Sequence, residues 1–225
     1  MNTKRKLDVK MIAVLGMLSA IAYVLASLIR IPLVPAVGFL GYEPKDVILV
    51  MAGFIYGPLA PLVMAAVIAL LEGFTTSVMG PIGIPMNFIA SVSFACTASA
   101  IYRKWRTLAG ATVGLLVSVV ITTIVMLLWN YALTPTLLGL PRPVVEAILI
   151  PGFLPFNLIK GTLNAAWTML LYKQVRTALN KSGLLPVSSN TPTPGATKVN
   201  IGVILVPAFV IITCVMIVLA WRGII

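Results

Sequence analysis

The sequence predicts an all-α integral membrane protein: a bundle of six helices, followed by a seventh membrane-spanning segment towards the carboxyl terminus. Three observations support this fold class. Hydrophobic residues make up 60% of the 225 residues and charged residues only 9%, whereas about 25% of a soluble domain is charged. The mean hydropathy is +1.09. Long apolar runs alternate along the chain with short polar or Gly/Pro-containing segments.

Each expected helix corresponds to an apolar run, and about 20 such residues cross a bilayer. The first run covers residues 11–29. A short second helix is expected over residues 47–56, because Gly57-Pro58 then breaks the run before a third helix over residues 59–71. The remaining helices of the bundle are expected over residues 87–102, 108–131 and 153–172.

Composition divides the chain into three parts. Residues 1–181 form the membrane domain. Residues 182–198 are rich in Ser, Thr and Pro, which is typical of a polar linker. Residues 199–225 contain a last apolar run, 199–221, that is long enough for a seventh span.

The positions of the 16 Lys and Arg residues predict the orientation of the bundle. With a cytoplasmic amino terminus, eleven of them fall on the cytoplasmic side. Lys160 lies within the sixth helix, and the others fall outside: Arg30, Lys45, Arg142 and Arg222. This is the positive-inside pattern of a multi-pass membrane protein. Because the basic residues gather in loops and form no single stripe, no nucleic-acid partner is expected.

The amino terminus has an alternative interpretation as a cleavable secretory signal. Lys4 to Lys6 precede an apolar run, and Ala20-Ile21-Ala22 has the small residues of a cleavage site. The apolar run continues to Ile29, however, which favours a membrane span over the shorter apolar region of a signal.

The composition also excludes several chemistries. With no histidine in the chain, imidazole metal sites and histidine general bases are excluded. The two cysteines, Cys96 and Cys214, lie far apart in apolar runs and suggest neither a disulfide nor a metal cluster. The sequence has no GxxxxGK[ST] phosphate loop. We therefore expect no cofactor, and any ATP-derived energy must come from a partner.

Polar residues on one face of the sixth helix give the candidate site. Asn157, Lys160 and Asn164 stand at i, i+3 and i+7, so at about 100° per residue they share one face. An ionisable residue inside a membrane is costly and marks a functional site by default. The structural alternative is that Lys160 pairs with Glu72 or Glu146.

Other polar residues are expected at the same, external end of the bundle. Asn130 ends the fifth helix, Glu72 ends the third, and Asp46 is expected to cap the second. Amides, a lysine, carboxylates and aromatic rings at one end of a bundle describe a pocket for a planar small molecule with polar edges. Alternatively, Asn130 and Asn157 are helix-end residues that cap or snorkel, and Trp129 and Tyr131 belong to an interfacial aromatic belt.

The first helix carries Gly16 and Ala20 in a small-xxx-small pattern, which lets another helix approach closely. The spacing fits packing inside the bundle as well as it fits a partner interface.

Four stretches of the sequence resemble the riboflavin-binding S components of energy-coupling factor (ECF) transporters. They are GFLGYEPKD before the second helix, GFIYGPLAP after it, WNYALTP at the end of the fifth, and LPFNLIKGTLN at the start of the sixth. The resemblance covers residues 6–173. It implies a six-helix S component in a prokaryotic cell membrane, which captures a vitamin outside. A transmembrane coupling subunit and two ATPases then drive its release inward.

The resemblance also implies roles for individual residues. Asn130 and the three polar residues of the sixth helix would contact the ligand, residues 40–46 would cover it, and Gly16 and Ala20 would face the coupling subunit. Gly41 and Glu43 depart from the lysine and aspartate of the family. The full candidate set for ligand binding is Leu40, Gly41, Tyr42, Glu43, Asp46, Glu72, Asn130, Asn157, Lys160 and Asn164.

The expected function is therefore capture of riboflavin or its phosphorylated form, FMN, without catalysis. Three alternatives remain from the sequence: an S component for another vitamin, a membrane enzyme acting on lipid head groups with Glu72 and Lys160 as acid and base, and a purely structural subunit.

Overall fold

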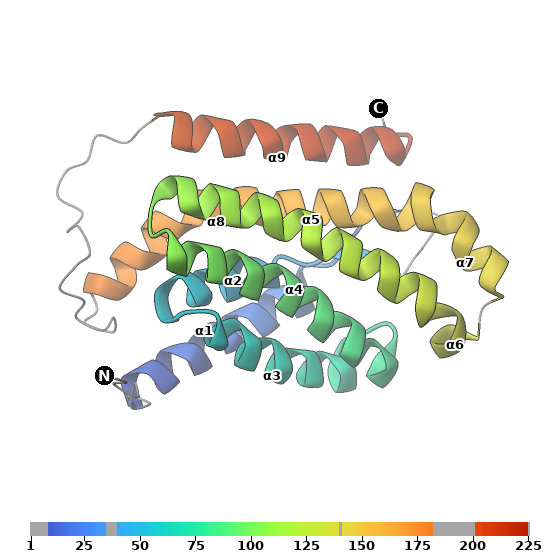
Figure 1. Cartoon of the computed structure of the whole chain (residues 1–225), viewed down its shortest axis with the longest axis horizontal. Helices are drawn as coiled ribbons and strands as arrows, with labels where there is room; N and C mark the ends of the chain where they lie inside the picture. Colours follow the sequence, from blue (N-terminus) through green and yellow to red (C-terminus); the bar gives the residue numbers. More distant parts are fainter. Residues whose placement is uncertain (1–8, 35–39, 140, 182–200, 225) are drawn as a thin grey trace.

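The computed structural model describes residues 9–34, 40–139, 141–181 and 201–224. All seven expected helices are present. They are α1 (Val9–Leu28), α2 (Lys45–Tyr56), α3 (Leu59–Thr75), α4 (Gly83–Lys104), α5 (Leu108–Ala132), α8 (Leu154–Lys181) and α9 (Ile201–Trp221). The expected linker, residues 182–198, lies outside the described residues. In Figure 1, α9 lies along one edge of the bundle and α1 and α3 lie along the opposite edge.

The helices carry the apolar exteriors of membrane spans. Five helical segments of the described residues are long and apolar enough to cross a membrane, and α3 is a shorter apolar helix. On α5, for example, Leu116, Val120 and Ile124 recur every four residues and are each more than half exposed. Leu115 and Val119 on the other face of α5 are buried in the core. The chain is thus an all-α integral membrane protein.

The break between α2 and α3 was predicted correctly, and its cause is the backbone at Gly57. This residue has a φ of 99°, a conformation that only glycine adopts without strain. Pro58 then occupies the N-cap position of α3. The chain therefore reverses direction within two residues, which places the end of α3 beside the start of α2.

Two connections between the expected helices contain structure of their own. Strands β1 (Ile31–Pro32) and β2 (Gly41–Tyr42) pair antiparallel, with Ile31 opposite Tyr42. The connection after α5 contains α6 (Thr134–Leu138), α7 (Arg142–Ile148) and the π-helical turn η2 (Leu149–Phe153). Prolines at the first or second position of α6 and α7 favour these short helices. We call the β1–β2 pair the hairpin, and the end of the bundle where it lies the hairpin end.

The chain direction brings many helix termini to the hairpin end. There α1, α3, α5 and α9 finish, and α2, α4 and α8 begin. A 3-10 turn, η1 (Gly80–Ile82), joins α3 to α4 at the same end. Polar residues near these termini are therefore brought together although they lie far apart in the sequence.

α1 is an integral part of the bundle. Val14, Leu18, Ala22 and Ala26 form a buried stripe along it, and the first three belong to the main hydrophobic core. This packing supports the membrane-span interpretation of the first apolar run.

Candidate functional site

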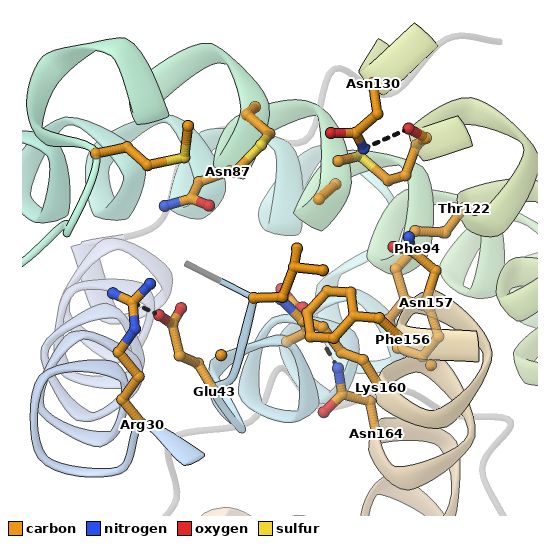
Figure 2. Close-up of a pocket in the computed structure, with 18 of the residues that line it drawn as sticks. Arg30, Glu43, Asn87, Phe94, Thr122, Asn130, Phe156, Asn157, Lys160 and Asn164 are labelled. Atoms are coloured by element: carbon orange, nitrogen blue, oxygen red, sulfur yellow. Dashed lines mark hydrogen bonds and ion pairs between the residues drawn. The ribbon is translucent and has the colours of Figure 1, made fainter. Parts of the chain in front are cut away.

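A pocket lies at the hairpin end between the β1–β2 hairpin, α2, α4, α5 and α8 (Figure 2). We call it the polar pocket. Its free volume is about 50 Å³, so its own side chains nearly fill it. It is lined by Arg30, Leu40, Gly41, Glu43, Asp46, Ser77, Met79, Met86, Asn87, Ala90, Phe94, Thr122, Met126, Asn130, Phe156, Asn157, Lys160, Gly161 and Asn164.

Eight of the ten candidate residues line this pocket, and Tyr42 and Glu72 do not. The backbone of the hairpin explains the position of Tyr42, because successive side chains of a strand point to opposite faces. Gly41 and Glu43 face the pocket, whereas Tyr42 packs in a hydrophobic cluster with Cys214 and Val218 of α9. Glu72 lies behind the pocket wall in an ion network described below.

The three polar residues of α8 share one face, as their spacing predicts, and all three line the pocket. Asn157 and Asn164 are buried, and Lys160 is partly buried. The Lys160 ammonium lies 5.9 Å from the centroid of the Phe156 ring. Among the described residues it forms no ion pair within 4 Å, so the expected alternative of a Lys160 pair with Glu72 or Glu146 is wrong.

The amides of Asn130 and Asn157 are held by hydrogen bonds to residues four positions away in the chain. The Nδ2 of Asn130 donates to the Met126 carbonyl at 2.6 Å, and the Thr134 hydroxyl donates to Asn130 Oδ1 at 2.9 Å. Asn157 Nδ2 donates to the Phe153 carbonyl at 2.7 Å. The alternative in which these two asparagines cap helix ends is therefore wrong: both amide NH₂ groups bond the carbonyl four residues earlier.

Asp46 was expected to cap α2, and this prediction is also wrong. The helix begins at Lys45, with Pro44 at the N-cap position and no side-chain cap. Because Asp46 already lies in the first turn, its carboxylate reaches across to other helices instead. It accepts a hydrogen bond from the Ser91 hydroxyl at 2.6 Å and one from Asn164 Nδ2 at 3.4 Å.

Two polar atoms in the pocket wall have no hydrogen-bond partner within the described structure. They are Asn164 Oδ1 and Thr122 Oγ1, and both are buried. An unsatisfied buried polar atom costs about 1–3 kcal/mol. The wall of the pocket therefore holds unused hydrogen-bonding capacity.

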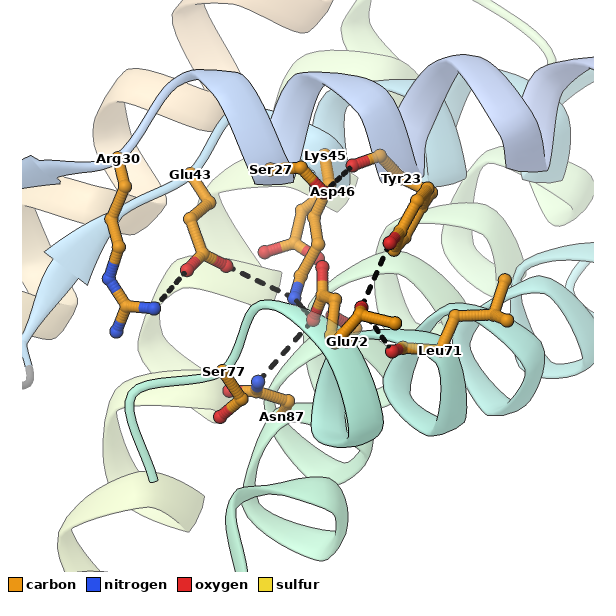
Figure 3. A network of polar contacts seen from close by, with 12 residues as sticks. Tyr23, Ser27, Arg30, Glu43, Lys45, Asp46, Leu71, Glu72, Ser77 and Asn87 are labelled. Atoms are coloured by element: carbon orange, nitrogen blue, oxygen red, sulfur yellow. Dashed lines mark hydrogen bonds and ion pairs between the residues drawn. The ribbon is translucent and has the colours of Figure 1, made fainter. Parts of the chain in front are cut away.

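A buried ion network supports the loop side of the pocket (Figure 3). Lys45 is only 2% exposed, and its ammonium contacts both Glu72 of α3 and Glu43 of the hairpin, the latter at 3.1 Å. Asn87 of α4 donates to Glu72 at 3.4 Å, and Arg30 lies 3.4 Å from Glu43. The network thus ties the hairpin and the start of α2 to α3 and α4.

Glu43 is the acidic member of this network that lines the pocket, together with Arg30 and Asn87. Burial by itself raises the pKa of its carboxyl, but the Lys45, Lys160 and Arg30 cations together hold that pKa below its ordinary value. Glu43 is therefore a carboxylate at neutral pH. It places a negative charge opposite the Lys160 ammonium.

Gly41 makes room for a cation from another element. A Cβ atom at this position would lie 2.8 Å from Cγ of Arg30. The Arg30 side chain therefore occupies the space beside the glycine, and it lines the pocket itself.

Sequence reasoning missed several lining residues, above all Arg30, Asn87 and Thr122. Asn87 had the same signal as the asparagines that were found, since it is a polar amide in an apolar run. Arg30 and Thr122 had no distinctive spacing. Lys45 was noted only as a loop charge, and its burial depends on three elements that meet in the folded chain.

Buried amides and one amine, gathered below a hairpin at one end of a membrane bundle, define a class of protein: a helical membrane subunit that binds a small polar ligand. Comparison with known proteins identifies the family. Residues 10–172 match the family model of the ECF transporter, substrate-specific component. The chain belongs to this family, and it is a multi-pass cell-membrane component of a transporter.

Individual relatives cover most of the chain. It is 33% identical over 190 residues to the riboflavin transporter RibU of Staphylococcus aureus (strain TCH60), covering 80% of this chain and all of that protein. It is 30% identical over 182 residues to the riboflavin transporter FmnP of Bacillus subtilis (strain 168), covering 76% of this chain and 94% of that protein. The family and both relatives are transporter components, which confirms the prediction that the chain is not an enzyme.

A solved structure of the S component of a bacterial ECF transporter has the same fold. It superposes with a TM-score of 0.65 at 34% identity, covering 76% of this chain and 97% of that one. The family match ends at residue 172, so α9 lies outside it.

Proposed function

We propose that this protein captures riboflavin, or its phosphorylated form FMN, in the polar pocket as the substrate-binding subunit of an ECF importer. The observation that carries the proposal is the convergence of Asn130, Asn157, Lys160 and Asn164 on one pocket. Two relatives named riboflavin transporters support the choice of ligand.

The chemistry of the pocket suits a flavin. Its ring system has alternating carbonyls and ring nitrogens along one edge, and an asparagine amide offers both an acceptor and donors. The unpartnered Asn164 Oδ1 would accept from a ring N–H, and the Lys160 ammonium would hold a carbonyl, a hydroxyl or a phosphate. Phe94 and Phe156 offer apolar faces for the ring.

The volume of the pocket requires the hairpin to move. Small-molecule sites typically have about 300–1,000 Å³, and the free volume here is about 50 Å³. Leu40, Gly41 and Glu43 form the lining on the hairpin side. We infer that this segment swings outward to admit the ligand and closes over it, and that release requires the same opening.

The positions of the basic residues support an orientation in the membrane. Positive-inside charge placement favours a cytoplasmic amino terminus, with the hairpin end outside. A transmembrane coupling subunit and two ATPases would then drive release inward.

Gly16 and Ala20 are both exposed on α1, and a Cβ atom added at Gly16 would meet nothing within 4 Å. This surface permits close helix packing. The vitamin-binding domain would comprise residues 1–181.

The test is to purify the full chain in detergent and record its visible absorption and flavin fluorescence. We expect a yellow protein with one flavin per chain and quenched fluorescence. A colourless protein that binds no added riboflavin at micromolar concentration would contradict the proposal. Titration of the flavin-free protein with riboflavin and FMN decides between these ligands, and a panel of other vitamins tests the second candidate, an S component for a different vitamin.

A further inference from the structure

We propose that a second cavity, beside α9, binds one acyl chain of an anionic membrane phospholipid whose phosphate lies at Arg222. This cavity, the α9 groove, is distinct from the polar pocket and shares no lining residue with it. It is lined by Leu25, Ile29, Ile31, Leu33, Tyr42, Pro44, Val47, Ile48, Leu163, Trp167, Leu171, Ile211, Cys214, Val215, Val218, Leu219 and Arg222.

The groove exists because α9 packs mainly against one helix. Its main contact is with α8, and α8 forms the floor of the groove. The end of α1 and the start of α2 form the opposite wall. A space remains between α9 and that wall, with a volume of about 460 Å³, which lies within the typical range of about 300–1,000 Å³ for ligand sites.

The length of the groove matches one leaflet of a bilayer. On α9 it is lined from Ile211 to Arg222, which at 1.5 Å per residue is about 16 Å. Half of a hydrocarbon core of about 30 Å is about 15 Å. Because α1, α8 and α9 are all membrane-spanning helices, the groove opens towards lipid tails, and an acyl chain fits its length.

The charge distribution favours an anionic head group. Of the residues that line the groove, one is charged, Arg222, and it stands immediately after the last residue of α9. Its guanidinium is suited to a phosphate, which it can bind with two parallel hydrogen bonds. Tyr42 also lines the groove, and its buried hydroxyl has no hydrogen-bond partner within the described structure.

The lining argues against a polar ligand as the occupant. A flavin is a poor match, because the lining has no amide side chain and no lysine. A single acyl chain is narrow and apolar, and it matches this lining.

The experiment is native mass spectrometry of the full chain with added phosphatidylglycerol or phosphatidylcholine. We expect the parent protein to retain one lipid and to prefer phosphatidylglycerol. Val215 lines the groove, so Val215→Trp should fill it and reduce retained lipid by about tenfold, a change of about 1.4 kcal/mol in binding. Val206 lies on the same helix, is 64% exposed and does not line the groove, so Val206→Trp is the matched control and should retain lipid as the parent does.

A second pair of variants tests the head group without altering the packing of the groove. Arg222→Gln should abolish the preference for phosphatidylglycerol, whereas Arg142→Gln should keep it, since Arg142 lies over the Tyr131 ring and not in the groove. Equal lipid retention by Val215→Trp and Val206→Trp would overturn the proposal, as it would mean that the lipid is only part of the surrounding shell. An unchanged head-group preference in Arg222→Gln, or a retained peptide or second copy in place of lipid, would also overturn it.

Discussion

The polar pocket encloses about 50 Å³ and presents amide and amine groups from α5 and α8, whereas the α9 groove has about 460 Å³ and one charged side chain. Within a bilayer, the larger cavity is the less selective one, because lipid tails can fill apolar space. Buried amides need a ligand whose donors and acceptors match them, since an unmatched group costs about 1–3 kcal/mol. Polar atoms, and not volume, therefore indicate where the transported ligand binds.

The two cavities also differ in what holds their walls. Lys45 forms ion pairs with Glu43 and Glu72 on the loop side of the polar pocket, while the groove is bounded by apolar packing against α8 and α1. Removing one partner of a buried ion pair leaves an uncompensated charge. A variant of this network should therefore damage the polar pocket much more than the groove.

The largest effect is expected for Lys45→Met. It would leave Glu43 and Glu72 buried without their shared cation, which costs about 3–5 kcal/mol of folding stability. Thermal unfolding of the detergent-purified protein measures this effect. Lys104→Met, at an exposed lysine of α4, is the control and should unfold with the parent. Equal unfolding temperatures for both variants would show that the network does not support the pocket.

Next in size are the variants that remove ligand-facing groups from α8. Asn157→Ala, Lys160→Ala and Asn164→Ala should each weaken riboflavin binding by about 1–3 kcal/mol, because a buried group of the ligand loses its partner. Fluorescence titration gives the dissociation constants. Lipid retention in the groove should not change in any of the three.

The matched control for these variants is Leu158→Ala, at a residue on the same helix that is 40% exposed and does not line the pocket. Its affinity for riboflavin should equal that of the parent. If all three polar variants bind as tightly as this control, the flavin lies elsewhere, and the α9 groove becomes the next place to search.

A smaller effect, a loss of about 1 kcal/mol of folding stability, is expected for Glu43→Gln, because the amide keeps an acceptor for Lys45 but loses the charge. The folded-state pKa of the Glu43 carboxyl is lowered from its ordinary value of 4.5. Its contribution to folding stability is thus fully present above pH 4.5 and is lost as the pH falls through the lower, folded-state value. Thermal unfolding measured from pH 7 to pH 3 should show an acid-side loss of stability that Glu43→Gln lacks. The same acid-side loss in both proteins would assign it to another group.

These contrasts explain which parts of the structure could be predicted from the sequence. The helices were predictable because each is an apolar run of bilayer length, and the face of Asn157, Lys160 and Asn164 was predictable because polar residues stand out in an apolar helix. The hairpin was missed because its strands have two residues each. Such short pairing leaves no periodic pattern.

Other features depend on contacts between elements distant in sequence. The ion pair of Lys45 with Glu72 joins residues 27 positions apart, and the hydrogen bond between Asp46 and Asn164 joins residues 118 positions apart. The α9 groove could not be predicted from the sequence for a different reason. Its lining has the same apolar composition as the lipid-facing surface, so only the packing of α9 shows that a cavity is there.

The smallest effect on either cavity is expected for Gly16→Leu. This residue is exposed on α1, a Cβ atom added to it would meet nothing within 4 Å, and it lines neither cavity. Riboflavin affinity and lipid retention should both equal those of the parent. If Gly16 and Ala20 face the coupling subunit, the leucine side chain should block close helix packing and abolish riboflavin uptake in cells that express the complete transporter. Unimpaired uptake would place the docking surface elsewhere, whereas a weakened riboflavin affinity would mean that α1 shapes the polar pocket from a distance.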